Sequence, residues 1–402
     1  MDCIYLDHNA TTPVDPRVLD VMLPYLRERF GNASSKTHPY GWTAAEAVEG
    51  AREKVARLLG ATAREVIFTS GATEANNIAL LGLFPPSAAG AKRSQIIISA
   101  VEHHAVLDTA AELVRRGFEA TLLRPDAHGR ISAAQVEEAI TDRTLLVSLM
   151  AANNELGTLN PLAGIGAITR RAGILFHTDA AQAAGKVPLD VESMGIDLLS
   201  ISGHKFYAPK GIGALYVRAR SPRIKLSPLH HGGGQERGLR PGTLNVPGIV
   251  GLGEACRIAS EDIAVSAAHE GSLRDRLHER IVSRLPGVRR NGHAVESLPG
   301  TLSLSFEGID GTALLVSLPD LAISSGSACT TGSTEPSYVL KAIGVPDDLA
   351  HATARFGVGR FTREEEVDRA ADRVVEVVGR LRAQLQGVGG PAGRDSGAPG
   401  IR

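Results

Sequence analysis

Lys205 lies in a setting that suits covalent chemistry. It ends the segment Ser-Gly-His-Lys (202–205), directly after the apolar run DLLSIS (197–202). Burial and a cationic neighbour such as His204 lower the pKa of a lysine, and the neutral amine can then form a Schiff base with an aldehyde. A structural lysine more often lies on a solvated helix face. The segment therefore favours a Schiff-base role for Lys205, with a structural role as the alternative.

Asp179 closes a second apolar run, GILFHTD (173–179), and begins Asp-Ala-Ala-Gln182. The Asp179 carboxylate and the Gln182 amide therefore lie within one turn of each other. A buried carboxylate without a partner is costly, so we expect a cationic group to face it. The protonated nitrogen of a pyridoxal ring would fit, because it makes the ring an electron sink. An ordinary N-cap aspartate is the alternative.

Three further segments could bind anions. Residues 70–74 (SGATE) follow the run EVIFT and open an expected helix, whose free amides and dipole favour a phosphate. The loop 232–243 combines glycines with two arginines. Arg355, between small and apolar neighbours, could clamp a carboxylate through two parallel hydrogen bonds. For SGATE, the alternative is a helix cap without a ligand. For Arg355, the alternative is a surface ion pair. The loop by itself does not indicate an anion site.

Cys329 lies in SSGSACTTGST (324–334), a run of small side chains. Reactive cysteines are exposed and have thiolate character, whereas structural cysteines are buried and inert. We therefore predict that Cys329 is a mobile nucleophile, poorly ordered or far from the cofactor ring without an acceptor. Cys3 and Cys256 lie in apolar or helical surroundings, and we expect structural roles for both.

His103 and His104 follow QIIISAVE (95–102) and raise the question of a metal site. Adjacent residues on a regular element point in different directions, and no third ligand follows at a short fixed spacing. We therefore expect no metal. A single imidazole ring stacked on a planar cofactor is the favoured interpretation, and a hydrogen-bonded core histidine is the alternative.

The composition argues against several classes of protein. The chain has 43 Lys and Arg against 44 Asp and Glu, so it lacks the positive charge that direct nucleic-acid binding requires. Three scattered cysteines and a start without a signal peptide predict a reducing, cytoplasmic location. No apolar run approaches the roughly 20 residues of a membrane span, so we expect no membrane insertion.

These residues are placed by an alternation of apolar runs and helical patterns. Such alternation predicts an α/β fold with a mainly parallel sheet covered on both faces. Capping boxes predict helix starts at Thr43–Glu46 and Ser132–Gln135, and Gly60 is expected to end the first of these helices. The expected strands lie at 65–70, 95–100, 118–124, 144–152, 173–179 and 197–202, with helices from about 72, near 105–116 and near 162–172.

The pattern changes after about residue 264, to a long helix, a strand-like run at 301–308 and a terminal helix at about 363–386. We predict a large domain over residues 15–263. Residues 1–14 and 264–386 are expected to form a smaller α+β domain that carries the Cys329 loop. The Gly- and Pro-rich stretch 387–402 is predicted to be a disordered tail.

Taken in order, the motifs resemble those of the cysteine desulfurases of the NifS/IscS kind, within the class V aminotransferase-like branch of the fold-type I pyridoxal-phosphate enzymes. The resemblance extends over nearly the whole chain, to about residue 380. The motifs include LDHNATTP (6–13), GNASSKTH (31–38), SGATEANN (70–77), EHHAVLD (102–108), NNELG (153–157), HTDAAQ (177–182), SGHK (202–205), GGGQERGLRPGT (232–243), SSGSACTTGSTEPSYVL (324–340) and RFGVGRFTREEE (355–366).

The resemblance implies pyridoxal 5'-phosphate as the cofactor and a role for each motif residue. Lys205 would hold the cofactor as a Schiff base, with Asp179 against the pyridine nitrogen and Gln182 on the phenolic oxygen. His103 would stack on the ring. The phosphate would be held by Ala72, Thr73, Ser202 and His204, joined by Thr243 from the other subunit of a homodimer.

Substrate binding and sulfur transfer are implied in the same way. Asn154, which also lies beside the cofactor, and Arg355 would bind the carboxylate of L-cysteine. Lys205 would remove the α-proton, Lys205 or His103 would act as the acid, and Cys329 would take the sulfur as a persulfide while L-alanine leaves. The sulfur would pass to an acceptor protein of iron-sulfur cluster assembly, tRNA thiolation or DNA phosphorothioation.

Two other functions fit the same fold. A selenocysteine lyase would share the cofactor but need not depend on Cys329. A catalytically silent interaction protein would keep the fold alone, although the intact set of Lys205, Asp179 and Cys329 argues against it.

Overall fold

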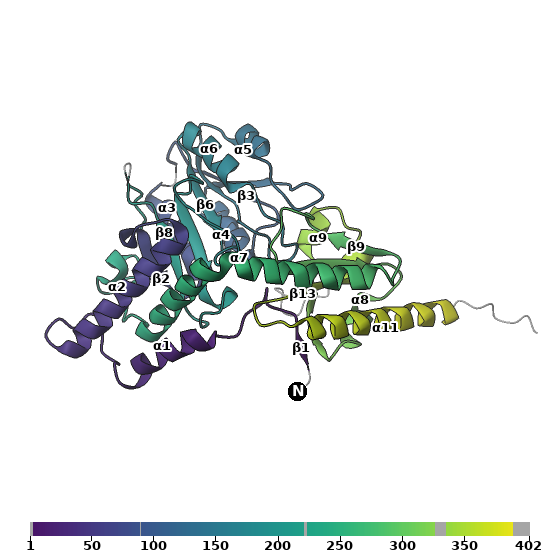
Figure 1. Ribbon diagram of the computed structural model, residues 1–402. Coiled ribbons are helices and arrows are strands. Elements are labelled where there is room, and N and C mark those ends of the chain that lie inside the picture. The colour runs from purple at the N-terminus through teal and green to yellow at the C-terminus, as the bar shows by residue number, and fades with distance from the viewer. Residues whose placement is uncertain (1–2, 89, 221–222, 326–334, 389–402) are drawn as a thin grey trace, which may run out of the picture.

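The computed structural model describes residues 3–88, 90–220, 223–325 and 335–388. The larger sheet of these residues has seven strands in the order β2-β8-β7-β6-β5-β3-β4 (Figure 1). The strands from β3 to β7 pair in parallel, and β8 is antiparallel to both of its neighbours. Their bounds are β2 Val66–Thr69, β3 Gln95–Ser99, β4 Glu119–Leu123, β5 Thr144–Ser148, β6 Leu175–Asp179, β7 Leu198–Ser202 and β8 Gly213–Val217.

The predicted α/β fold is confirmed, because both faces of this sheet are buried. In β3, for example, Ile97 packs into one apolar cluster while Ile96 and Ile98 pack into another on the opposite face. Successive side chains of a strand point to opposite faces, so an uninterrupted apolar run means two covered faces. The sequence prediction missed β8, the run GALYV, which lies between β2 and β7.

The described residues also form α-helices, some of which cover the two faces of this sheet. They are α1 Pro16–Arg27, α2 Pro39–Leu59, α3 Ala72–Leu83, α4 His104–Arg115, α5 Ala133–Ala139, α6 Leu162–Ala172, α7 Val246–Val282, α8 Gly311–Val316, α9 Tyr338–Ala342, α10 Asp347–His351 and α11 Glu364–Val388. The capping box at Ser132 does start α5, and Gly60 ends α2 in the left-handed conformation with φ 67°.

The predicted helix start at Thr43 is wrong, because α2 begins four residues earlier at Pro39. The His38 ring accepts a hydrogen bond from the Gly41 amide at 3.3 Å, and proline occupies the first turn, where its missing N–H is no loss. The long helix expected from about residue 264 starts at Val246, so it is longer than the pattern indicated.

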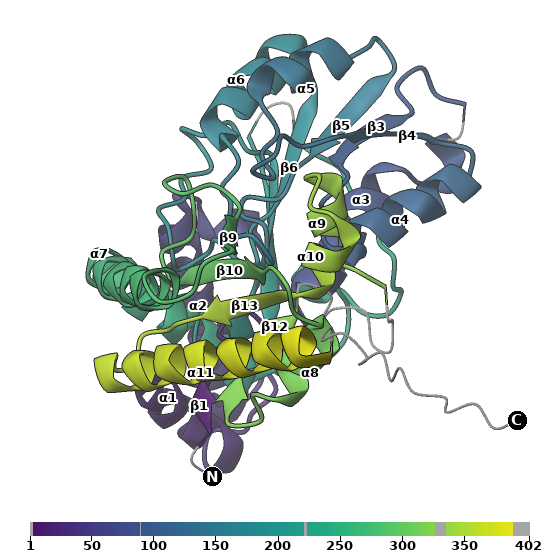
Figure 2. The same cartoon turned by 90° about the vertical axis from the view of Figure 1, so that its right-hand side faces the viewer.

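A smaller sheet, β12-β13-β10-β9, lies beside the larger one. Its strands are β9 Val288–Asn291, β10 Thr301–Phe306, β12 Ser324–Ser325 and β13 Thr353–Gly357, and β1 Ile4–Tyr5 pairs in parallel with β11 Leu321–Ala322 nearby. Helix α11 lies across this sheet (Figure 2) and shares its apolar core. Long helix α7 packs on α1 and α2 at one end and on α11 at the other (Figure 1). The division into domains at residues 14 and 263 remains a prediction.

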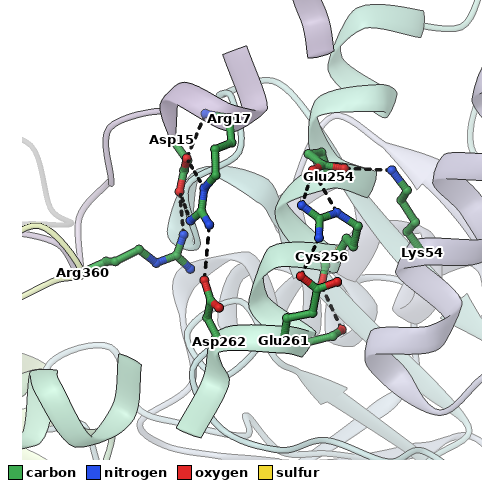
Figure 3. A network of polar contacts seen from close by, with 10 residues as sticks. Asp15, Arg17, Lys54, Glu254, Cys256, Glu261, Asp262 and Arg360 are labelled. Atoms are coloured by element: carbon green, nitrogen blue, oxygen red, sulfur yellow. Dashed lines mark hydrogen bonds and ion pairs between the residues drawn. The ribbon is translucent and has the colours of Figure 1, made fainter. Parts of the chain in front are cut away.

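Ion pairs join the N-terminal segment, α7 and the C-terminal part of the chain (Figure 3). Asp15, almost completely buried, accepts hydrogen bonds from Arg17 at 2.8 Å and from Arg360 at 2.7 Å. Hydrogen bonds from Arg17 are the largest cause that lowers the pKa of Asp15, to about 2. Arg17 also reaches Asp262 of α7 at 3.5 Å. The network therefore fixes the chain where it passes between the two sheets.

No helix among the described residues is both long and apolar enough to cross a membrane.

Candidate active site

A cavity of about 530 Å³ opens at the carboxyl ends of β2, β3, β5, β6 and β7. This edge is where an open parallel sheet offers a ligand crevice, because the loops that follow the strands meet there. Ten of the twelve predicted site residues line the cavity: Ala72, Thr73, His103, Asn154, Asp179, Gln182, Ser202, His204, Lys205 and Arg355. Arg355 comes from β13 of the smaller sheet, so both sheets contribute to the site.

Lys205 follows β7 in a short 3-10 turn and is half-buried. Its Nζ donates hydrogen bonds to the carbonyl oxygens of Asn9 and Ala10, both at 2.8 Å. These two residues belong to the N-terminal segment and also line the cavity. The amine is thus held by neutral acceptors at the cavity wall, where an aldehyde can reach it.

His204 was expected to be a cationic neighbour of Lys205, but its ring is neutral near pH 7. Burial, followed by the charges of Lys205, Lys210 and Lys186, lowers the pKa of His204 to about 4. Its Nδ1 lies 3.1 Å from the hydroxyl of Thr11. A neutral ring that accepts this hydroxyl proton carries its own proton on Nε2 and can donate it to an anion.

Asp179 ends β6 and is 5% exposed. Its Oδ2 accepts from the side-chain amide of Asn76 at 2.7 Å, and its Oδ1 accepts from the backbone N–H of Ala181 at 2.9 Å. Among the described residues no lysine, arginine or histidine forms an ion pair with it. The cationic partner expected from the sequence is therefore not a described side chain, and the carboxylate faces the cavity with neutral donors only.

His103 is the N-cap of α4, and its Nδ1 accepts from the Ala105 amide at 3.0 Å. Burial is the largest cause that lowers the pKa of His103, while the charge of Asp179 acts in the opposite direction. The ring is therefore neutral near pH 7 and carries its proton on Nε2. A neutral, fixed imidazole at the cavity wall suits stacking on a planar ring.

The first turn of α3 forms the part of the cavity suited to an anion. Gly71 precedes the helix, and a Cβ atom at Gly71 would meet the Ser202 hydroxyl at 3.4 Å. Thr73 is exposed and Ala72 is buried. Glu74 in the same turn accepts from the Ser70 amide at 2.5 Å and pairs with Arg240 at 3.2 Å, so its charge is directed away from the remaining amides.

Arg355 and Asn154 lie together at the side of the cavity nearest the smaller sheet. One terminal nitrogen of Arg355 donates to the backbone carbonyl of Asn154 at 2.8 Å, and the other pairs with Asp7 at 2.9 Å. The Arg355 side chain is 3% exposed, so the surface ion pair considered as an alternative is wrong. Gln182 donates to the carbonyl of Asn9 at 2.8 Å.

Two predicted residues are not among those that line the cavity. Thr243 lies in a second cavity of about 460 Å³, which also contains Glu74 and Arg240. The two cavities therefore adjoin at Glu74, and the role of Thr243 on another subunit's cofactor remains a prediction. Cys329 lies outside the described residues.

Sequence reasoning missed Asn76 and Asp7. Asn76 stands within the quoted motif SGATEANN, one helical turn after Ala72, a spacing that places both on the same face of α3. That spacing could have singled it out. Asp7 gave no comparable signal, because its contact with Arg355 joins residues 348 positions apart.

Comparisons with known proteins agree with this geometry. The sequence model described as "Aminotransferase class-V" matches residues 4–370. The chain belongs to this family. Its enzymes depend on pyridoxal 5'-phosphate, which is therefore the cofactor of this chain, and the predicted family resemblance is confirmed.

Among curated relatives, a "Cysteine desulfurase IscS" of Anaeromyxobacter dehalogenans (strain 2CP-C) is 52% identical over 94% of this class V chain and 93% of its own length. A solved structure described as "NIFS-LIKE PROTEIN" is 38% identical, with a TM-score of 0.87 over 94% of this chain and all of its own. Another, "SspA in complex with cysteine", is 41% identical, with a TM-score of 0.78 over 89% and 99% of the two chains.

Proposed function

We propose that this chain is a cysteine desulfurase that converts L-cysteine to L-alanine and keeps the sulfur on Cys329 as a persulfide. In this reaction the Cys329 sulfur attacks the substrate sulfur, an S–S bond forms as the C–S bond breaks, and the electron pair left on the β-carbon takes up one proton. The observation that carries the proposal is that Lys205, Asp179 and Arg355, from three different segments, line one cavity. The relatives named above support the choice of cysteine as substrate.

The residues of the cavity fit pyridoxal 5'-phosphate. Asp179 offers a carboxylate without a cationic partner to the pyridine nitrogen, and Gln182 lies nearby for the phenolic oxygen. The first turn of α3 with Ser202 and His204 offers neutral donors to the phosphate. When bound, the cofactor supplies an aldehyde for amines and a ring that withdraws electrons from the substrate α-carbon.

The protein's own groups would bind cysteine and move its protons. Arg355 and Asn154 hold the substrate carboxylate, which orients the α-carbon toward Lys205. The Lys205 amine, once released from the cofactor, takes the α-proton on Nζ. His103, neutral and protonated on Nε2, is placed to return a proton to the product, alongside Lys205.

Sulfur transfer is assigned to Cys329 on the strength of the sequence resemblance. The segment that contains Cys329 leaves the described structure at Ser325 and returns at Glu335. At the first of these ends, Ser324 of β12 pairs with Arg355 of β13, so the cysteine-bearing segment begins beside the substrate-carboxylate site.

The decisive experiment mixes the purified holoenzyme with L-cysteine and a reducing thiol and measures L-alanine and sulfide. Equal amounts of both are expected from the wild type, and none from Cys329→Ala. Cys3→Ala, which removes an exposed thiol elsewhere in the chain, is the matched control and should behave as wild type. Full activity of Cys329→Ala on cysteine would refute the desulfurase proposal, and activity on selenocysteine alone would identify a selenocysteine lyase.

We further propose that the protein acts as a homodimer with an acceptor protein as its partner, in the cytoplasm. The helices α1 and α2 and their connection expose Leu26, Phe30, Tyr40 and Trp42, the last at 56%. Four large exposed apolar side chains on neighbouring segments suit an interface with a second copy of the chain. Light scattering after size exclusion should give twice the mass of the 402-residue chain, and Trp42→Glu with Phe30→Glu should yield a monomer. A wild-type monomer would contradict the proposal.

A further inference from the structure

Asp7 contacts the residue that is proposed to bind the substrate carboxylate. Its Oδ1 accepts from a terminal nitrogen of Arg355 at 2.9 Å. The other terminal nitrogen of Arg355 donates to the carbonyl of Asn154 at 2.8 Å. The guanidinium is therefore held from two sides. Its Nε, buried, has no hydrogen-bond partner among the described residues, and each terminal nitrogen has a second N–H, so donors remain for a ligand.

Asp7 is itself held in place. Its second oxygen, Oδ2, accepts from the hydroxyl of Ser324 at 2.8 Å, and its backbone pairs with Gly357 of β13. Ser324 and Arg355 are direct neighbours across the β12-β13 pair. Three segments that are far apart in the sequence thus meet around one carboxylate, and each fixes the position of the next.

A guanidinium binds a carboxylate well only when its planar fork is aimed, because the hydrogen bonds are directional. Arg355 has a long side chain in a cavity of about 530 Å³ and could otherwise take several orientations. The contacts from Asp7 and Asn154 fix the plane of the guanidinium of Arg355, which lines the cavity. The same ion pair also offsets the cost of burying the charge of Arg355. A positioning role is therefore tested by ligand binding and not by stability.

We propose that Asp7 is a positioning residue, which aims Arg355 at the carboxylate of the amino-acid substrate and is itself set by Ser324. This inference rests on the proposed function. It predicts that removal of Asp7 weakens binding of ligands that have a carboxylate and spares ligands that lack one.

The test compares L-cysteine with cysteamine, which has the same amine and thiol but no carboxylate. Both are titrated into holoenzyme in a Cys329→Ala background, and binding is read from the cofactor absorbance. Asp7→Ala should raise the Kd of L-cysteine about tenfold, the scale of losing one charge-assisted contact, and leave that of cysteamine within about twofold. Asp7→Asn keeps an acceptor for Arg355 and a partner for Ser324, so it should restore L-cysteine binding to within about threefold of the parent.

Ser324→Ala keeps the Asp7–Arg355 pair and should weaken L-cysteine binding about threefold without affecting cysteamine binding. This variant tests the inference even where Asp7→Ala does not fold. The matched control is Ser305→Ala, which removes a buried hydroxyl bonded to Thr353 in the same sheet and should change neither ligand. Equal losses for both ligands, or unchanged cysteine binding in Asp7→Ala or in Ser324→Ala, would overturn the inference. A wild-type enzyme that makes no alanine from cysteine would refute the proposed function instead, and the inference with it.

Discussion

The side-chain amide of Asn76 donates a hydrogen bond to the Asp179 carboxylate at 2.7 Å. Asn76 lies on α3, the helix after β2, and Asp179 ends β6 of the same sheet. A neutral donor fixes the carboxylate without neutralising its charge. Together with the Ala181 amide, it holds the carboxylate in place at the wall of the cavity, where a ligand can meet it.

Replacement of Asp179 by asparagine is expected to lower kcat about 100-fold or more, because a preorganised charge opposite the pyridine nitrogen is lost. The geometry of the site should persist, since asparagine has the same shape and its new N–H can bond the Asn76 carbonyl oxygen once that amide turns over. The measurement is alanine formation from L-cysteine under saturating cofactor. Cofactor absorbance should show that the variant remains loaded, and a loaded variant with wild-type kcat would contradict the assignment of Asp179.

Asn76→Ala should have a smaller effect, a loss in kcat of about tenfold, because one of the two neutral donors to Asp179 remains. The matched control is Asn77→Ala. Asn77 is the next residue of α3, its amide donates to the Thr73 carbonyl at 2.9 Å, and it does not contact Asp179. Equal effects of the two alanine variants would mean that α3 was disturbed as a whole.

Lys205 is expected to be the one site of covalent cofactor attachment. Treatment of the holoenzyme with borohydride should fix the cofactor to the peptide that contains Lys205, as read by peptide mass spectrometry. Lys205→Ala should lose this adduct, and Lys210→Ala, which removes another amine that lines the cavity, should keep it. An adduct on Lys210 in the wild type would show that the assignment is wrong.

The placement of site residues at the ends of strands could be predicted from the sequence, because it depends only on residues that are adjacent in the chain. Asp179 and Lys205 each come directly after an apolar run, so a parallel sheet brings them to one edge whatever the details of packing. The start of α2 was mispredicted because the Pro39 turn, capped by His38, competes with the capping box at Thr43, and nothing local ranks the two.

Contacts between segments that are distant in the sequence could not be predicted, for a different reason. The Asp7–Arg355 pair depends on how the N-terminal segment packs on β13, and the Glu155–Ser337 hydrogen bond depends on how the start of α9 packs on the loop after β5. Strand β8 was missed because GALYV is short and follows the Lys205 segment closely, with no helical pattern between it and the preceding strand. The antiparallel position of β8 cannot be inferred from periodicity, which indicates burial but not direction.

Gly253 lets α7 approach α2 closely, and we expect Gly253→Ala to destabilise the fold by about 1–3 kcal/mol. A Cβ atom at this position would lie 2.7 Å from both the Cα and the Cβ of Ala51, so the two helices would have to separate. Gly271→Ala is the matched control on the same helix, with open space around the new atom, and should stabilise by about 0.5–1 kcal/mol. Denaturant unfolding of both variants under identical cofactor loading decides the matter, and a stabilised Gly253→Ala would disprove the close contact.

Glu155 gives a prediction for the dependence of stability on pH. It is 3% exposed, and its carboxyl accepts from the Ser337 hydroxyl at 2.5 Å. Burial raises the pKa of Glu155 from 4.5 to about 7, and Ser337 and Arg355 only partly oppose that rise. Below pH 4.5 the group is protonated in the folded and the unfolded chain alike. Between pH 4.5 and about 7 only the unfolded chain releases the proton, so rising pH destabilises the fold until the penalty levels off.

Glu155→Gln removes that titration and keeps an acceptor for Ser337. Its unfolding free energy relative to the wild type should therefore improve between pH 4.5 and pH 8, by about 3 kcal/mol on the scale of 1.4 kcal/mol per pKa unit. Urea unfolding at the two pH values measures the difference, with Glu53→Gln on the exposed face of α2 as the control. A Glu155→Gln effect that is the same at both pH values would show that the carboxylate is ionised in the folded protein throughout this range, held in that form by Arg355.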